Sequence, residues 1–280
     1  MVSVPRSGQG GGPPAQDPRC YSTLGRVLGV VFRPQLPPER LRAVAEAAEV
    51  AGVDQLWLWE DSFFEGGIAS ASAALAWTSQ LQVGIGLLPV PLRNPALAAM
   101  EIATVERLFP GRFLPGLGHG VLDWMAQAGA AVTSPMTLLR EYTAAVRALL
   151  AGERVSTAGR YVRLDDVALD WPPESPPPVL VGARGPKTVR LAGELGDGLL
   201  LDSSATLDAV RAARAAVDEV RADRPFRVVL NVLVDDPGAV PDRVAAAREA
   251  GADVVVLEPP EDAPDPEPLI AALSRHTAGG

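Results

Sequence analysis

Short runs of β-branched and aliphatic residues alternate with longer segments of helical periodicity along most of the chain. This alternation is typical of repeated βα units, and it predicts a parallel sheet covered by helices. The runs are almost uniformly aliphatic, as expected for strands that are buried on both faces. The predicted strands lie at residues 26–32, 54–60, 81–88, 112–117, 179–182, 198–202, 227–234 and 253–258.

The segments between these runs predict one helix after each strand. After the first strand, Leu41, Val44, Ala45 and Ala48 recur at the spacing of one helical face, and Gly52 marks the end of that helix. The pattern breaks between residues 152 and 178, where an alternating stretch and a proline run predict a small hairpin and a loop. The last four helices are predicted at 186–195, 206–222, 239–250 and 265–275.

Eight consecutive βα units predict a closed (β/α)8 barrel, or TIM barrel, of the α/β class. A doubly wound sheet usually has about five or six strands, whereas eight strands in about 250 residues close into a barrel. We therefore expect residues 25–280 to form one barrel domain with a short insertion after the fourth helix. Residues 1–24 are rich in glycine and proline, and we expect them to form a flexible, disordered tail.

Composition excludes several classes of function. The formal charge is −9 and basic residues do not cluster, which argues against a nucleic-acid partner. The apolar runs are too short to cross a bilayer, and the N-terminus lacks the order of a signal peptide, so a cytoplasmic protein without a membrane partner is expected. A single cysteine, Cys20, and two histidines, His119 and His276, argue against a disulfide and a zinc site, so no metal is expected.

One glycine-rich turn is the strongest candidate for a binding site. The carboxyl ends of barrel strands meet at one rim, where the residues directly after the strands build the site. In VGARGPKT a strand opens into a helix, which offers unpaired backbone N–H groups to a phosphate, and two basic side chains add charge. The alternative is an ordinary βα turn. The predicted phosphate-binding residues are Gly182, Ala183, Arg184, Gly185, Pro186 and Lys187.

A second glycine-rich strand end, GLGHG, covers residues 116–120. Backbone at Gly118 and Gly120 could approach a flat ring or a ribityl-type chain, since glycine has no side chain in the way. His119 offers an imidazole to the same rim and is a candidate catalytic acid or base. The alternative is a flexible turn with a surface histidine.

Two adjacent carboxylates end the second predicted strand. Successive strand residues point to opposite sides, so one of Glu60 and Asp61 is expected to enter the rim while the other caps the following segment. Solvated loop acids are the alternative. Trp57 and Trp59 on this strand could stack on a ligand or fill the core. In GIGLLPVPLRNP, residues 84–95, two glycines followed by prolines predict either a bulge or a plain glycine-weakened strand.

These segments, taken in order, resemble the luciferase-like superfamily, and in particular its coenzyme F420-dependent branch, which includes methylenetetrahydromethanopterin reductase. The resemblance extends over about residues 28–202 and is carried by GVVFRP, AEAAEVAGVDQLWLWED, LQVGIGLLP, RNPALAAMEIATVERLFPGRFLPGLGHG, REYTAAVRALLAGERVSTAGRYVRL and PPPVLVGARGPKTVRLAGELGDGLLL.

The resemblance implies a barrel with an insertion, commonly a homodimer, that holds a flavin or deazaflavin at the rim. It implies that the phosphate tail of the cofactor lies on residues 182–187 and that residues 118–120 line the cofactor. It also implies a cis peptide bond between Gly86 and Leu87, which brace the deazaflavin ring. The chain departs from the family at the second strand, which usually ends in Asp-His. Here Asp61, Glu60 or His119 would have to take the role of the missing histidine.

Three functions are compatible with these features. The first is an F420-dependent oxidoreductase that transfers hydride to or from a small organic substrate. The second is an FMN-dependent monooxygenase that uses reduced flavin and oxygen in a sheltered pocket. The third is a non-catalytic barrel that binds a cofactor. The fold alone does not choose among them. The phosphate turn and the GIGLLP and LAGERV segments resemble the F420-dependent branch most, which favours the first function.

Overall fold

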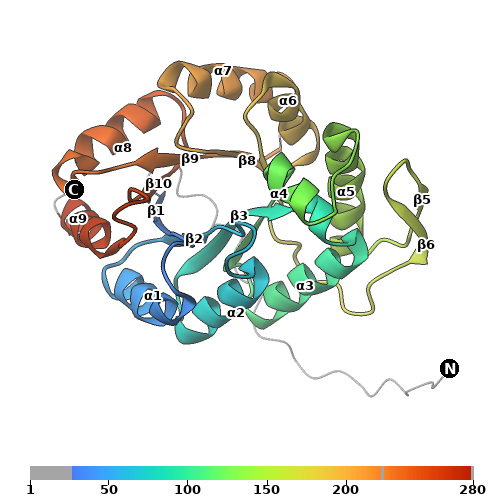
Figure 1. Ribbon diagram of the computed structural model, residues 1–280, viewed down its shortest axis with the longest axis horizontal. Helices are drawn as coiled ribbons and strands as arrows, with labels where there is room; N and C mark the ends of the chain where they lie inside the picture. Colours follow the sequence, from blue (N-terminus) through green and yellow to red (C-terminus); the bar gives the residue numbers. More distant parts are fainter. Residues whose placement is uncertain (1–26, 222–223, 279–280) are drawn as a thin grey trace.

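The computed structural model describes residues 27–221 and 224–278 of the chain, with side chains described as far as Arg275 (Figure 1). The tail predicted at residues 1–24, Cys20 and the side chain of His276 lie outside the described residues.

Eight parallel strands close into a barrel in the order β1-β10-β9-β8-β7-β4-β3-β2. The barrel closes because β1 pairs with β2 on one side and with β10 on the other. The prediction of a (β/α)8 barrel is therefore confirmed. The strands are β1 (Val27–Phe32), β2 (Gln55–Leu58), β3 (Gln82–Pro89), β4 (Phe113–Gly118), β7 (Leu180–Gly182), β8 (Gly198–Leu201), β9 (Arg227–Leu233) and β10 (Val254–Glu258).

Helices surround this barrel on the outside (Figure 1). Over the described residues, no helix combines the length and the apolar character that crossing a bilayer requires. The helices of the outer ring are α1 (Leu41–Val50), α2 (Gly67–Trp77), α3 (Pro95–Leu108), α5 (Pro135–Leu150), α6 (Pro186–Leu195), α7 (Leu207–Asp218), α8 (Val240–Glu249) and α9 (Glu267–Ala278). Short 3-10 turns precede three of them, at η2 (Pro38–Arg40), η3 (Val90–Leu92) and η4 (Pro237–Ala239).

Local sequence explains where several helices begin. The side chain of Asn94 accepts a hydrogen bond from the Ala96 amide at the start of α3, and Pro95 occupies the first helical position. Thr206 caps α7 in the same way through the Ala209 amide. Both caps satisfy amide groups that have no partner within the helix.

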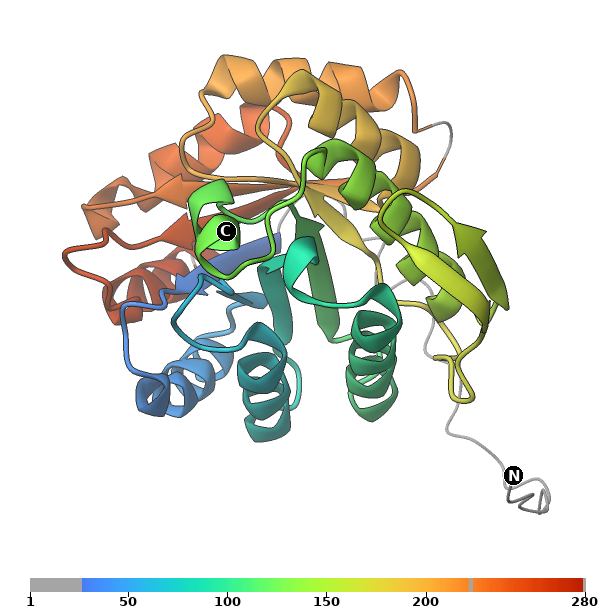
Figure 2. The same cartoon turned by 45° about the vertical axis from the view of Figure 1, so that its right-hand side comes forward.

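Two features interrupt the regular alternation between β4 and β7. The predicted hairpin is confirmed: β5 (Val155–Ala158) pairs antiparallel with β6 (Arg163–Val167) and stands outside the barrel beside α5 (Figure 2). A short helix that the sequence analysis did not predict, α4 (Leu122–Gln127), lies in the loop between β4 and α5. Its six residues are too few to display a helical period.

Trp57 fills the interior of the barrel. It is fully buried in a cluster that is separate from the core between sheet and helices. A Cβ atom on Gly84 would lie 2.5 Å from Cε3 of this indole, so glycine is needed where the ring crosses the neighbouring strand. Of the two readings for Trp57, core filling is therefore confirmed. The other members of the cluster are Val31, Leu114, Leu180, Val229, Val254 and Val256.

Candidate active site

A chain of charged side chains runs along the carboxyl-terminal rim of the barrel, and we call it the rim network. Its members follow five different strands, β2, β1, β10, β8 and β7. They come together because parallel strands all end at the same rim. Ion pairs join Arg33 to Glu258 and Arg184 to Asp202. The positive charge of Arg33 also acts on Asp61, and the like charge of Asp202 acts on Glu258.

The centre of the rim network is the buried ion pair between Arg33 and Glu258, whose exposed fractions are 7% and 3%. Arg33 Nε also donates to the Pro259 carbonyl at 2.6 Å, and the guanidinium lies 5.0 Å from the centroid of the Trp59 ring. Burial raises the pKa of Glu258, against the opposing effects of Ser203 and Arg33. This pair was not among the predicted site residues, although both members stand at strand ends.

Asp61 lies at one end of the rim network. Burial raises the pKa of this carboxyl group, the positive charge of Arg33 opposes that shift, and Glu261 adds to it. A half-buried carboxyl group with a raised pKa can take up or release a proton nearer to neutral pH than an exposed aspartate can.

Asp202 and Arg184 form the other end of the rim network. Burial acts to raise the pKa of Asp202, but hydrogen bonds from Ser204 and from Arg184 outweigh it, and the pKa lies below its usual value. This carboxylate therefore stays ionised. It binds the exposed side chain of Arg184, which belongs to the predicted phosphate turn.

Glu60 binds partners outside the rim network, although it is adjacent to Asp61 in the sequence. Its partners are Arg93 and the Gly67 amide. Its carboxylate is buried and binds both terminal nitrogens of Arg93, in the loop before α3. It also accepts a hydrogen bond of 2.7 Å from the Gly67 amide, at the start of α2. Glu60 thus ties β2 to two following elements, which favours a structural role for this residue.

His119 is half-buried at the end of β4. Its ring donates to the Pro135 carbonyl, and because Nδ1 is buried without a partner among the described residues, the donor is Nε2. Burial lowers the pKa of the imidazole despite this hydrogen bond. His119 is therefore neutral at neutral pH, with the lone pair of Nδ1 available as an acceptor.

The predicted phosphate turn joins β7 to α6. Gly185 is the N-cap residue of α6, at φ −104° and ψ 159°, and its position carries no side-chain cap. A Cβ atom on Gly185 would meet nothing within 4 Å, so the space beside the helix N-terminus is open. Lys187 is exposed in the first turn, and Pro186 occupies the first helical position. These features are compatible with an anion at this turn.

The ends of β3, β4 and β7 meet around the side chain of Leu87. A Cβ atom on Gly118 would lie 2.3 Å from Leu87 Cδ2, and one on Gly182 would lie 2.4 Å from the same atom. The two glycines stand on adjacent strands and make room for Leu87. Gly120, just beyond, has φ +69°, a left-handed conformation that favours glycine.

Two predictions for β3 are confirmed. The peptide bond between Gly86 and Leu87 is cis. The pairing of β3 with β4 also shifts register between Ile85 and Leu88, so the strand has a bulge rather than a plain glycine-weakened course.

Glu65, in the loop between β2 and α2, is a buried acid that no sequence pattern indicated. Both of its carboxyl oxygens are buried without a hydrogen-bond partner among the described residues, and burial raises the pKa to about 7. The two phenylalanines before it, Phe63 and Phe64, are exposed, and the Ser62–Phe63 peptide bond is cis. No periodicity in so short a loop indicates that the acid would be buried and the aromatic residues exposed.

The chain is similar to proteins of one family. Residues 19–255 match the family model described as luciferase-like monooxygenase. The chain is 33% identical, over 240 residues, to an F420-dependent hydroxymycolic acid dehydrogenase of Mycobacterium tuberculosis, covering 80% of this chain and 66% of that protein. It is 31% identical, over 178 residues, to a 5,10-methylenetetrahydromethanopterin reductase of Methanolobus tindarius, covering 63% of this chain and 54% of that protein. The chain thus spans about half to two thirds of the length of these curated relatives.

Solved structures share the fold. A coenzyme F420-dependent tetrahydromethanopterin reductase from Methanopyrus kandleri matches with a TM-score of 0.78 and 18% identity, covering 89% of this chain and 97% of that one. The oxygenating constituent of 3,6-diketocamphane monooxygenase from Pseudomonas putida, in complex with FMN, matches with a TM-score of 0.71 and 16% identity, covering 88% and 95%. At these identities the likeness shows the barrel alone.

Proposed function

The chain belongs to the luciferase-like monooxygenase family, and from this premise we propose that it is an oxidoreductase that uses coenzyme F420. In this proposal it transfers hydride to or from a small organic substrate at the carboxyl-terminal rim of the barrel. The observation that carries the proposal is the open turn at Gly185, which stands beside the rim network and near the bulged strand β3. The names of the curated relatives supply the identity of the cofactor.

The described residues fit the phosphate tail and the ring system of such a cofactor. The space beside the N-terminus of α6, with Lys187 in its first turn, suits a phosphate. Residues 182–187 would hold that tail, and Gly86, Leu87, Gly118 and Gly120 would lie along the ring. When bound, F420 supplies the carbon that accepts or donates the hydride.

Asp61 is the residue that we assign to proton exchange with the substrate. Burial raises its pKa, and the positive charge of Arg33 opposes that shift. His119 is the second choice, because it stands at the end of β4 but its Nδ1 is buried and burial lowers its pKa. Glu60 is a weaker candidate, since Arg93 and the Gly67 amide occupy its oxygens.

The cofactor is tested by titrating the purified protein with F420 and, separately, with FMN, following the fluorescence of each ligand. We expect F420 to bind at micromolar concentration and FMN to bind far more weakly. Preferential binding of FMN, with oxygen consumption in the presence of reduced FMN, would show that the protein is an FMN-dependent monooxygenase instead. Binding of F420 without turnover over a panel of alcohols, aldehydes and unsaturated carbonyl compounds would support the non-catalytic barrel instead.

A homodimer is part of the same proposal, and the outer face of α2 and α3 is its expected interface. These helices lie side by side on the outside of the barrel (Figures 1 and 2). The α2 sequence GIASASAALAW contains no charged residue. On α3, Leu97, Met100 and Leu108 are 46%, 55% and 65% exposed. Several exposed apolar side chains on neighbouring helices are typical of a protein–protein interface.

We expect Met100→Glu to convert the dimer to a monomer at micromolar concentration, because the interface would bury an unpaired charge. Light scattering after size-exclusion chromatography measures the change in mass. Leu207→Glu is the matched control, since Leu207 is 39% exposed at the start of α7, across the barrel from α2 and α3 (Figure 1). A wild-type protein that is already monomeric, or a dimer that tolerates Met100→Glu, would contradict the assignment of this face.

A further inference from the structure

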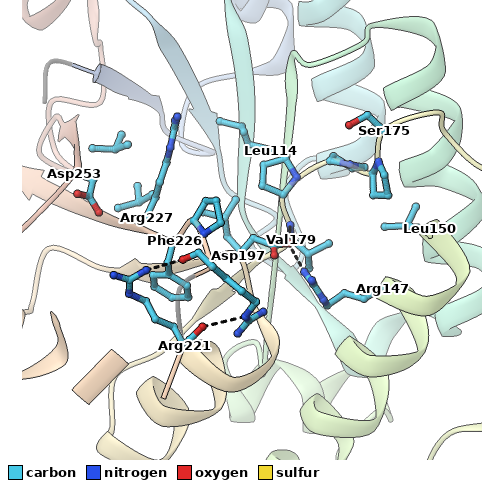
Figure 3. Close-up of a pocket in the computed structure, with 18 of the residues that line it drawn as sticks. Leu114, Arg147, Leu150, Ser175, Val179, Asp197, Arg221, Phe226, Arg227 and Asp253 are labelled. Atoms are coloured by element: carbon cyan, nitrogen blue, oxygen red, sulfur yellow. Dashed lines mark hydrogen bonds and ion pairs between the residues drawn. The ribbon is translucent and has the colours of Figure 1, made fainter. Parts of the chain in front are cut away.

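A cavity of about 780 Å³ opens at the amino-terminal end of the barrel, opposite to the rim network (Figure 3). Its position follows from the strand residues that line it. Leu180 and Val254 are the first residues of β7 and β10, and Leu114 is the second residue of β4. Active sites of such barrels form at the other end of the strands. The cavity is therefore separate from the proposed cofactor site.

The inner wall of this cavity is apolar. Leu114, Leu180, Val229 and Val254 belong to the cluster that fills the barrel, and Trp57 of the same cluster also lines the cavity. The outer part of the wall contains a proline run at residues 176–178, together with Leu150 and Phe226. A cavity of this size and character suits a small organic molecule with an apolar body.

Arginine dominates the polar part of the lining. Two aspartates, Asp197 and Asp253, line the same cavity. In Figure 3, Arg227 and Asp253 lie on one side of the cavity, and Arg147 lies on the other. Five arginines and two aspartates thus line one cavity in a protein whose net charge is −9. The arginines that line the cavity are Arg147, Arg214, Arg221, Arg224 and Arg227.

Both lining aspartates already have partners. Asp197 binds Arg147 and accepts a hydrogen bond of 2.9 Å from the Val179 amide. Asp253 binds Arg214 at 2.7 Å. Asp218, which does not line the cavity, pairs with Arg221 at 2.7 Å. These ion pairs hold Arg147, Arg214 and Arg221 in place.

Arg224 is held in a different way. Its guanidinium donates to the carbonyl oxygens of Gly193 and Glu194, at 2.6 and 3.1 Å, and its Nε donates to the Arg221 carbonyl at 3.1 Å. These carbonyl groups stand at the C-terminal end of α6 and orient the guanidinium, whose Nη1 also lies 3.5 Å from the Gly196 carbonyl. Arg224 forms no ion pair with a carboxylate of the described residues. A preformed arginine of this kind favours a carboxylate, a sulfonate or a phosphate.

We propose that this cavity binds an organic anion with an apolar body, of the class of a medium-chain carboxylate. The apolar part lies against Leu114, Leu180, Val229 and Val254, and the anionic group lies against Arg224. The site works independently of the cofactor, because the two sites stand at opposite ends of the barrel.

The proposal is tested with the full chain and the fluorescent probe 1-anilinonaphthalene-8-sulfonate, which combines a sulfonate with an apolar body. We expect the probe to bind in a saturable manner and to be displaced by decanoate. Decanol, which has a chain of the same length and no charge, is expected to displace it at least about fivefold less well, since its hydroxyl group forms no charge-assisted bond with a guanidinium. Saturating F420 is expected to leave probe binding unchanged.

Arg224→Gln removes the positive charge and retains an amide donor, and we expect it to weaken decanoate binding about fivefold. Arg211→Gln is the matched control, because Arg211 lies on the exposed face of α7 and does not line the cavity. Thermal unfolding checks that both variants fold. Equal displacement by decanol, competition by F420, unchanged affinity in Arg224→Gln, or no saturable binding at all would each overturn the proposal.

Discussion

Replacing Glu60 with leucine is expected to lower the free energy of unfolding by about 3–5 kcal/mol, the usual cost of removing one partner from a buried ion pair. The substitution leaves the partly buried Arg93 without the carboxylate that binds both of its terminal nitrogens. It also leaves the Gly67 amide, at the start of α2, without its acceptor. Chemical denaturation measures the change in unfolding free energy.

The double variant Glu60→Leu/Arg93→Met separates this explanation from a general loss of packing. Removing both charges should recover part of the stability, because replacing a buried ion pair by apolar residues is often nearly neutral. Recovery is incomplete because Glu101, 3.2 Å from Arg93 Nε, loses this partner. If Glu60 instead acts mainly in catalysis, Glu60→Leu would lower turnover and leave the unfolding free energy almost unchanged. Asp61→Asn is the matched comparison on the neighbouring position, and it is expected to lower turnover with little effect on stability.

The contrast between these two acids shows how far the sequence predicts the site. The two-residue period of a strand predicts that adjacent side chains point to opposite sides, so one acid at the rim and one directed elsewhere could be expected. Which acid enters the rim depends on Arg93, which lies 33 residues further along the chain. A pattern within one strand carries no information about such a partner.

The barrel itself was predictable because each of its elements is specified locally. Aliphatic runs, helical periods and terminal caps lie within a few residues of one another, and the order of the strands follows from the repetition of βα units. The rim network could not be predicted in the same way. Arg33 and Glu258 meet only because β1 and β10 close the barrel, 225 residues apart in the sequence. The cavity at the other end likewise combines residues from several distant elements.

Replacing Gly185 with aspartate is expected to weaken the binding of F420 about tenfold or more, and to leave the stability of the protein unchanged or slightly higher. The backbone at Gly185 has a negative φ, and a Cβ atom there meets nothing within 4 Å, so an aspartate fits without strain. Aspartate is among the preferred N-cap residues, and at this position it stabilises a helix by roughly a few tenths of a kcal/mol more than glycine does. The same carboxylate would compete for the amides of α6 and repel a phosphate.

Gly185→Ser separates the effect of the added charge from the effect of the N-cap, since serine is also a preferred N-cap residue but is neutral. We expect Gly185→Ser to bind F420 within about twofold of the unchanged protein, because no like charge is added beside the phosphate. Raising the ionic strength should narrow the difference between the aspartate and serine variants, because the turn is exposed to solvent and its charges are screened. Fluorescence titration with F420 measures both affinities. If the aspartate variant binds F420 as tightly as the serine variant does, the phosphate does not lie on this turn, whichever residues hold the ring.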